Sequence, residues 1–213
     1  MKHPPLLVAM DLEGVLVPEI WINVAEATGV AELRLTTGDV ADYDELMQGR
    51  LEAMRKHNIL LPDIQQVIGQ MSPFPGAVEF LEELRSQFQV VIISDTFYEF
   101  ATPLMRSLGW PALFCNTLVT DENDMVTGYN LRQQDGKRKA VTALSDLNFK
   151  VVAVGDSYND TTMLQQADLG ILFHAGEKVK RDFPSLPTCD DYNDLLTRIR
   201  DFEQQRQQEH CRR

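Results

Sequence analysis

Short apolar runs recur along the chain, and most are separated by stretches whose apolar residues repeat with a helical period. Each run is closely followed by glycine, serine or acidic residues, a pattern typical of strands buried on both faces of a parallel sheet. The predicted strands are Leu6–Met10, Val90–Ser94, Val151–Gly155 and Leu169–Phe173. The predicted helices between them are Pro75–Phe88, Gly136–Leu147 and Asn159–Ala167. This alternation predicts an α/β fold with a parallel sheet.

The segment Glu19–Gln70 interrupts the alternation, because it has helical periodicity and no run typical of a strand. We expect a small helical cap, inserted directly after the first strand and hinged at prolines 18, 73 and 75. The expected helices are Ile22–Thr28, Tyr43–Met54 and Asp63–Met71. The predicted division is a core domain of residues 1–17 and 73–213 and a cap domain of residues 18–72.

Two other segments depart from the simple alternation. Phe114–Leu131 contains turn signals at Asp121–Asn123 and Gly128, and it is predicted to form a β-hairpin. The tail from Asp201 is very polar and rich in glutamine, and it is predicted to be frayed.

Composition and charge narrow the possible partners. The formal net charge of −12 opposes non-specific binding to nucleic acid or to an anionic membrane, and its simplest role is solubility. The first apolar run is too short for a signal-peptide core or a membrane span. The cysteines are Cys115, Cys189 and Cys211. Their odd number and the absence of metal-site spacing favour a reducing cytoplasm over a disulfide framework.

Acidic residues follow two of the predicted strands. The first strand is followed by Asp11-Leu-Glu13, and the third ends in Gly155-Asp156-Ser-Tyr-Asn159-Asp160. Ligands of open α/β sheets bind at the carboxyl ends of the strands. Several carboxylates buried there together need a cation, and oxygen ligands suit Mg²⁺. The sequence therefore predicts a magnesium site at this edge.

The two acids after the first strand suit covalent catalysis. Asp11 could attack phosphorus and form an aspartyl-phosphate, which divides a difficult hydrolysis into two steps. Side chains alternate along an extended backbone, so Glu13 would point to the same side and act as general acid and base. The Glu13 carbonyl oxygen could also bind the metal. The alternatives are an ordinary turn aspartate and an exposed loop acid.

Other polar residues offer sites for a phosphate. Ser94, Asp95 and Thr96 end a predicted strand and open a helix, so their hydroxyls and backbone N–H groups could bind an anion or simply cap that helix. Lys137 begins a predicted helix and could offset the charge of a transferring phosphoryl group. A solvated basic turn is the alternative, because Arg138 and Lys139 follow directly.

The second acidic segment has the spacing of a single helix face. Asp156, Asn159 and Asp160 stand at positions i, i+3 and i+4. Asp156 would bind the metal, and Asn159 and Asp160 would hold the metal or the phosphate. A helix start with a capping aspartate is the alternative.

In this order, the segments resemble the haloacid dehalogenase superfamily of phosphotransferases, and within it the phosphoserine phosphatase branch. The resemblance implies a Rossmann-like core with a helical cap and a Mg²⁺-dependent phosphatase. It implies metal ligation by Asp11, Glu13 and Asp156, and phosphate binding by Ser94, Lys137 and Asn159. In the cap it implies that Glu19 binds the substrate ammonium and Arg50 its carboxylate, in a bidentate contact.

The chain departs from the general pattern at three positions. Glu13 replaces the usual second aspartate, a substitution shared with a bifunctional group of phosphoserine phosphatases and homoserine phosphotransferases that the chain resembles more closely. Asp95 replaces the glycine that follows the motif serine. Gly38 stands where that group is expected to have arginine, which affects a cap contact rather than the chemistry.

Three hypotheses follow. The first is hydrolysis of phosphoserine, or of another small phosphomonoester, through Asp11. The second is transfer of the phosphoryl group to an acceptor alcohol such as homoserine. The third is an inactive sensor of phospho-amino acids, which would not need the nucleophile. The sequence does not predict the oligomeric state.

Overall fold

The computed structural model describes residues 4–40 and 42–211. Its centre is a seven-stranded sheet in the order β4-β3-β2-β1-β5-β6-β7. All neighbouring strands are parallel except β3 and β4. The strands are β1 (Leu6–Met10), β2 (Gln89–Phe97), β3 (Ala112–Thr120), β4 (Val126–Asn130), β5 (Lys150–Gly155), β6 (Leu169–Phe173) and β7 (Thr188–Cys189). The α/β fold with a mostly parallel sheet is confirmed.

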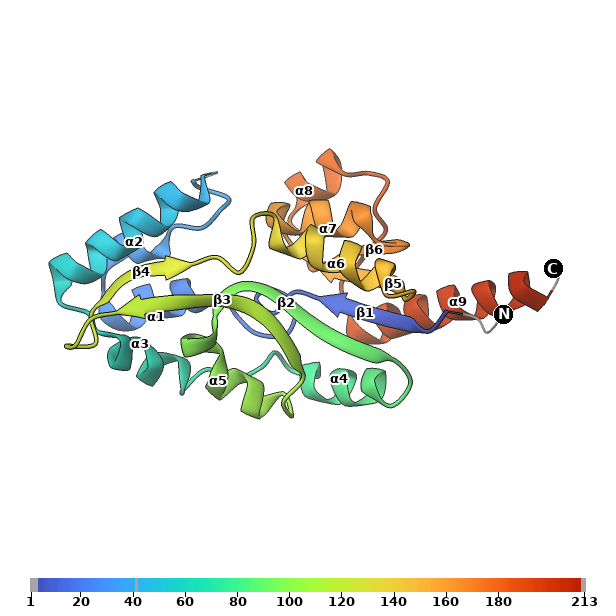
Figure 1. The fold of residues 1–213 in the computed structure, drawn as a ribbon, viewed down its shortest axis with the longest axis horizontal. Coiled ribbons are helices and arrows are strands. Elements are labelled where there is room, and N and C mark those ends of the chain that lie inside the picture. The colour runs from blue at the N-terminus through green and yellow to red at the C-terminus, as the bar shows by residue number, and fades with distance from the viewer. Residues whose placement is uncertain (1–3, 41, 212–213) are drawn as a thin grey trace.

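Helices cover both faces of the sheet. In Figure 1, α4 and α5 lie below it and α6 and α7 above it. β1 serves both layers, since Val8 and Met10 join one apolar core while Leu7 and Ala9 join the other. This explains why the strand is apolar throughout. The covering helices are α4 (Ala77–Arg85), α5 (Tyr98–Ser107), α6 (Gly136–Asp146), α7 (Thr161–Gln166), α8 (Glu177–Asp182) and α9 (Tyr192–Cys211).

The segment after β1 is helical in the described residues. It contains α1 (Ile20–Thr28), a 3-10 turn at Ala31–Arg34, α2 (Tyr43–His57) and α3 (Leu61–Ile68). The division of the chain at residues 18 and 73 stays a prediction.

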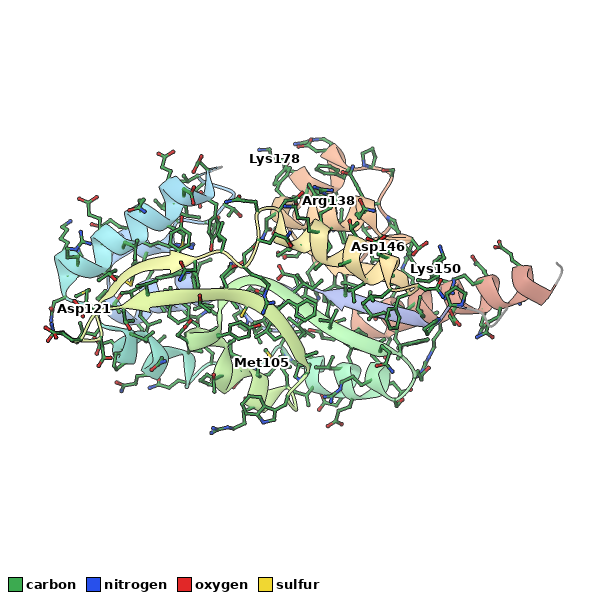
Figure 2. The ribbon with its side chains drawn as sticks, in the orientation of Figure 1. Met105, Asp121, Arg138, Asp146, Lys150 and Lys178 are labelled. Carbon is green, nitrogen blue, oxygen red and sulfur yellow. The ribbon has the colours of Figure 1, made fainter. Side chains whose placement is uncertain are left out.

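The predicted hairpin is present, and it supports the helical segment. β3 and β4 extend the sheet beneath α2, where Tyr129 of β4 donates a hydrogen bond to Asp44. Asp121 lies at the hairpin turn, far from Lys150 at the start of β5 (Figure 2). Its carboxylate accepts hydrogen bonds from the backbone N–H groups of Asn123 and Met125.

The prediction of a frayed tail is wrong, because α9 continues to Cys211. The Arg206 guanidinium donates a hydrogen bond of 2.8 Å to the Pro4 carbonyl oxygen, and it lies 5.8 Å from the Phe202 ring. These contacts hold a helix whose composition alone suggests a solvated end. No helix in the described ranges is long and apolar enough to cross a membrane.

Candidate active site

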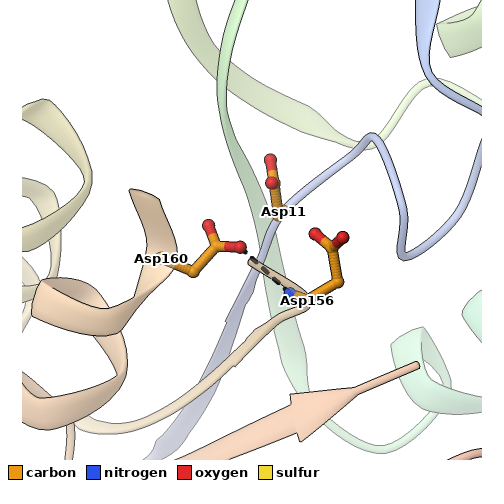
Figure 3. A group of neighbouring side chains, drawn as sticks. All are labelled: Asp11, Asp156 and Asp160. Atoms are coloured by element: carbon orange, nitrogen blue, oxygen red, sulfur yellow. Dashed lines mark hydrogen bonds between the residues drawn. The ribbon is translucent and has the colours of Figure 1, made fainter. Parts of the chain in front are cut away.

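Two neighbouring strand ends bring the first and second acidic segments together. β1 and β5 pair in parallel, and the Asp11 N–H continues the ladder by donating to the Val154 carbonyl oxygen at 2.9 Å. Asp11 is 4% exposed. Figure 3 shows its carboxylate beside those of Asp156 and Asp160. One carboxylate oxygen from each residue lies within 4.8 Å of the others.

Lys137 is the buried cation of this cluster. It lies in the first turn of α6 and is 4% exposed, and its Nζ is 2.8 Å from Asp11 Oδ2 and 2.6 Å from Asp160 Oδ1. Burial alone would lower the Lys137 pKa, but the facing Asp11 and Asp160 carboxylates raise it well above its usual value. The structure therefore decides between the three basic residues of this turn. Arg138 instead pairs with Asp135, away from the cluster.

Asp160 holds the loop after β5. It is fully buried, and its second oxygen accepts hydrogen bonds from the N–H groups of Asp156 (3.0 Å) and Ser157 (3.1 Å). A Cβ at Gly155 would meet the Asp160 side chain at 2.4 Å, so this turn requires glycine. The predicted single helix face is wrong. Asp156 follows the strand, the 3-10 turn begins only at Tyr158, and Asp160 reaches back to the loop.

Glu13 connects the strand end to the cap. Its Oε2 accepts a hydrogen bond of 2.8 Å from the Ile20 N–H, at the start of α1. Burial raises the Glu13 pKa to about 8, and the neighbouring Glu19 carboxylate contributes. Gly14, the residue after Glu13, has a φ of 74°, and a Cβ there would lie 2.4 Å from the Asp156 carboxyl group. Only glycine lets the chain pass so close to this acid.

The two predicted cap residues face the same cavity from different elements. Glu19 precedes α1 and forms a side-chain hydrogen bond with Glu13; burial raises the Glu19 pKa. Arg50 is a buried residue of α2, and burial lowers its pKa to about 10. Its Nη2 donates to the Leu35 carbonyl oxygen at 2.8 Å. Its Nε is buried without a hydrogen-bond partner in the described structure, which leaves a donor for a ligand.

Ser94, Asp95 and Thr96 line the same cavity. The prediction that they open a helix is wrong, because β2 continues to Phe97 and α5 begins at Tyr98. The pairing of β2 with β3 shifts register between Ile93 and Phe97, so the strand is irregular here. The Asp95 carboxylate accepts a hydrogen bond of 3.0 Å from Asn159 Nδ2.

Two aromatic residues of the site were missed by the sequence analysis. The Trp21 ring lies 4.6 Å from the Arg50 guanidinium carbon and packs edge-on against Phe100. The Tyr43 hydroxyl donates to the Asp95 carbonyl oxygen at 3.1 Å and so joins α2 to β2. Both residues belong to amphipathic helices, where an aromatic residue is normally part of the core. No local signal distinguishes these two.

A cavity of about 360 Å³ joins the strand ends to the cap. Asp160 lies beneath it, and the other residues predicted for the site line it: Asp11, Glu13, Glu19, Arg50, Ser94, Asp95, Thr96, Lys137, Asp156 and Asn159. A larger cavity of about 900 Å³ adjoins it and shares Ser94, Asp95, Lys137 and Asn159. The smaller cavity has acids and a lysine at its floor and one arginine at its roof, which suits a small zwitterion that carries a phosphate.

The carboxylates at the floor fit a divalent cation. Burial and the neighbouring Asp160 raise the Asp11 pKa well above its usual value, while Lys137 opposes this shift. Burial likewise raises the Asp156 pKa to about 7. A cation between Asp11 and Asp156 would favour both charged forms. Asp160 uses both oxygens within the protein, and Asp11 likewise contacts the Leu12 N–H at one oxygen and Lys137 at the other.

Comparison with known proteins gives consistent matches. Residues 6–168 match the family described as haloacid dehalogenase-like hydrolase. A "Phosphoserine phosphatase ThrH" of Pseudomonas aeruginosa is 56% identical over 89% of this chain and 92% of its own length. A "Phosphoserine phosphatase" of Pseudomonas syringae pv. tomato is 56% identical over 89% of this chain and 80% of its own.

Solved structures agree on the fold. A phosphoserine phosphatase described as a phospho-aspartyl intermediate analogue has a TM-score of 0.73 at 20% identity, and covers 92% of this chain and 99% of its own. The phosphoserine phosphatase of T. onnurineus has a TM-score of 0.70 at 25% identity, and the match covers 93% of this chain and 97% of that structure's chain.

Proposed function

This chain belongs to the haloacid dehalogenase-like hydrolase family, and we propose that it is a Mg²⁺-dependent phosphoserine phosphatase. The observation that carries the proposal is the contact of 2.8 Å between Asp11 and Lys137, at the floor of a cavity whose roof holds Arg50. The names of the two Pseudomonas relatives support the substrate.

In the first step, an Asp11 oxygen attacks phosphorus and the bond from phosphorus to the serine oxygen breaks. Glu13 gives its proton to the departing oxygen. A Glu13 pKa of about 8 supports this role, because the group is mostly protonated near neutral pH. In the second step, water attacks the aspartyl-phosphate while Glu13 takes a proton from it. Inorganic phosphate leaves, and Asp11 is restored.

The remaining side chains bind and orient. Asp11, Asp156 and the Glu13 carbonyl oxygen would hold Mg²⁺, which offsets the charge of the phosphoryl group. Ser94, Lys137 and Asn159 would bind phosphate oxygens, together with the backbone N–H groups of residues 95 and 96.

At the cap, Glu19 would take the substrate ammonium. Arg50 would take the carboxylate, and its unpartnered Nε supports that role. Trp21 supports the guanidinium from its face.

The phosphoryl group would also pass to homoserine. Glu13 has one methylene more than aspartate, which leaves the general base farther from its backbone. An acceptor alcohol would replace water in the second step, and Glu13 would take its proton in the same way. Phosphohomoserine would then leave in place of inorganic phosphate.

The buried free thiols of Cys115 and Cys189 suit a reducing cytoplasm, which we propose as the compartment.

The decisive experiment combines a substrate screen with trapping of the intermediate. Small phosphomonoesters are incubated with Mg²⁺, with and without homoserine, and acid-quenched samples are analysed for phosphate on Asp11. We expect phosphoserine to be preferred and Asp11 to be labelled transiently. Binding of phosphoserine without labelling or turnover would instead identify a sensor. Preference for an unrelated phosphomonoester would reject the assigned substrate.

A further inference from the structure

The Asp95 carboxylate stands among the groups assigned to phosphate oxygens. It accepts the hydrogen bond from Asn159 Nδ2 at 3.0 Å, and its Oδ2 lies 3.6 Å from Lys137 Nζ. Two of the three side chains that would bind the phosphoryl group therefore face an acid of the chain itself.

A carboxylate and a phosphoryl dianion compete for these donors. Asn159 Nδ2 has two N–H donors, one of which Asp95 takes, and Lys137 Nζ already contacts Asp11 and Asp160. Like charges side by side disfavour each other. The phosphoryl group must therefore displace the Asp95 carboxylate before it can bind in full.

The surroundings of Asp95 allow this displacement. Its backbone is held, because its carbonyl oxygen accepts hydrogen bonds of 3.1 Å from both the Tyr43 hydroxyl and Asn116 Nδ2. Its side chain is 41% exposed, whereas that of Lys137 is 4% exposed. Asp95 also lines the larger cavity of about 900 Å³, so a rotated carboxylate has space there.

We propose that Asp95 sets the affinity of the site for phosphate. Its carboxylate contacts the Asn159 and Lys137 donors when no phosphate is bound, and it turns into the larger cavity when phosphate binds. The proposal rests on the phosphate site of the proposed function. Its consequence is weaker binding of inorganic phosphate, and so faster release of that product. A site covered for about nine-tenths of the time binds with an apparent Kd about tenfold weaker.

The test measures the Kd of inorganic phosphate by calorimetric titration at a fixed Mg²⁺ concentration. Asp95→Asn keeps the size of the side chain and removes its charge, and Asp95→Ala removes the competing group. Asp135→Asn is the matched control, because Asp135 lines the same larger cavity but bonds to Arg138 and Thr162 instead. Thermal melts verify that each variant is folded.

We expect both Asp95 variants to bind phosphate about tenfold more tightly than the wild type, with the control unchanged. Inhibition of phosphoserine hydrolysis by phosphate should strengthen in parallel. Unchanged or weaker binding in the Asp95 variants would overturn the proposal, as would equal tightening in Asp135→Asn, which would indicate a general charge effect. The proposed function would survive either result if the wild type hydrolyses phosphoserine. A wild type and variants that all fail to bind phosphate would reject the phosphate site together with this role of Asp95.

Discussion

The floor and the roof of the site cavity are built in different ways. At the floor, Asp11 and Asp156 follow directly from paired strands, and Lys137 forms buried ion pairs with Asp11 and Asp160. At the roof, Arg50 comes from a helix, and its Nε has no partner in the described structure. At the floor, Lys137 and the acids already pair with one another, whereas the roof has a contact still to make. This difference indicates that the floor carries out the chemistry and the roof selects the molecule.

The largest effect is expected when the floor alone is disabled. Asp11→Asn removes the attacking charge while keeping the shape, and should lower kcat on every phosphomonoester by about 10³-fold or more. Phosphate release from phosphoserine and from an aryl phosphate measures the loss, and thermal melts verify folding. Asp146→Asn, an exposed acid at the end of α6, is the control. Near-normal turnover by folded Asp11→Asn would reject the nucleophile.

Disabling the roof alone should separate substrates. Arg50→Ala is expected to raise KM for phosphoserine by about 30-fold and to leave an aryl phosphate little affected, because only the amino acid needs the guanidinium. Arg50→Lys should rescue only in part, since an ammonium cannot make the forked contact. Arg55→Ala, at an exposed position of the same helix, is the control. Equal losses on both substrates would place Arg50 in the chemistry or in the folding of the cap.

The acids at the floor should make stability depend on pH and metal. The Asp156 pKa is raised from 3.8 to about 7 in the folded chain, so the folded state binds the extra proton between these values. The contribution of Asp156 to the free energy of unfolding therefore falls as pH rises through that window. In metal-free buffer near pH 8, Asp156→Asn should be more stable than the wild type by on the order of 2 kcal/mol.

This difference should vanish near pH 4 and reverse when Mg²⁺ is added, because the wild type alone regains a carboxylate ligand. Denaturant unfolding at several pH values measures both effects. If the difference in the free energy of unfolding stayed constant across pH, burial would not be raising the Asp156 pKa in the folded chain.

The smallest expected effect lies where the floor meets the roof. Glu13→Asp moves the general base about 1.5 Å towards the backbone. It should raise the ratio of hydrolysis to transfer onto homoserine by about threefold, because the base is then better placed for water. Glu13→Gln should suppress both reactions. Inorganic phosphate and phosphohomoserine are counted separately, and an unchanged ratio would place acceptor choice in the cap around Gly38.

The sequence predicts the floor better than the roof for a physical reason. Strand periodicity and parallel pairing place Asp11 and Asp156 side by side, so their meeting can be inferred from local pattern. The choice of Lys137 over its basic neighbours depends on how α6 packs, which no local pattern shows.

Trp21 was missed because an aromatic residue in an amphipathic helix is usually core. The end of β2 was misjudged because the register shift near Ser94 depends on β3, a later strand.

The crowding at Gly14 has a consequence for how this chain can diverge. A Cβ there would lie 2.4 Å from the Asp156 carboxyl group. A library of all substitutions at this position, selected for phosphatase activity, should therefore retain only glycine. In the cap, a Cβ at Gly38 would meet nothing closer than Thr36 Oγ1 at 3.4 Å, and larger residues are admissible. Neutral drift can therefore change the rim of the cavity while the floor stays invariant. Lineages built on this scaffold should exchange substrates more readily than they exchange reactions.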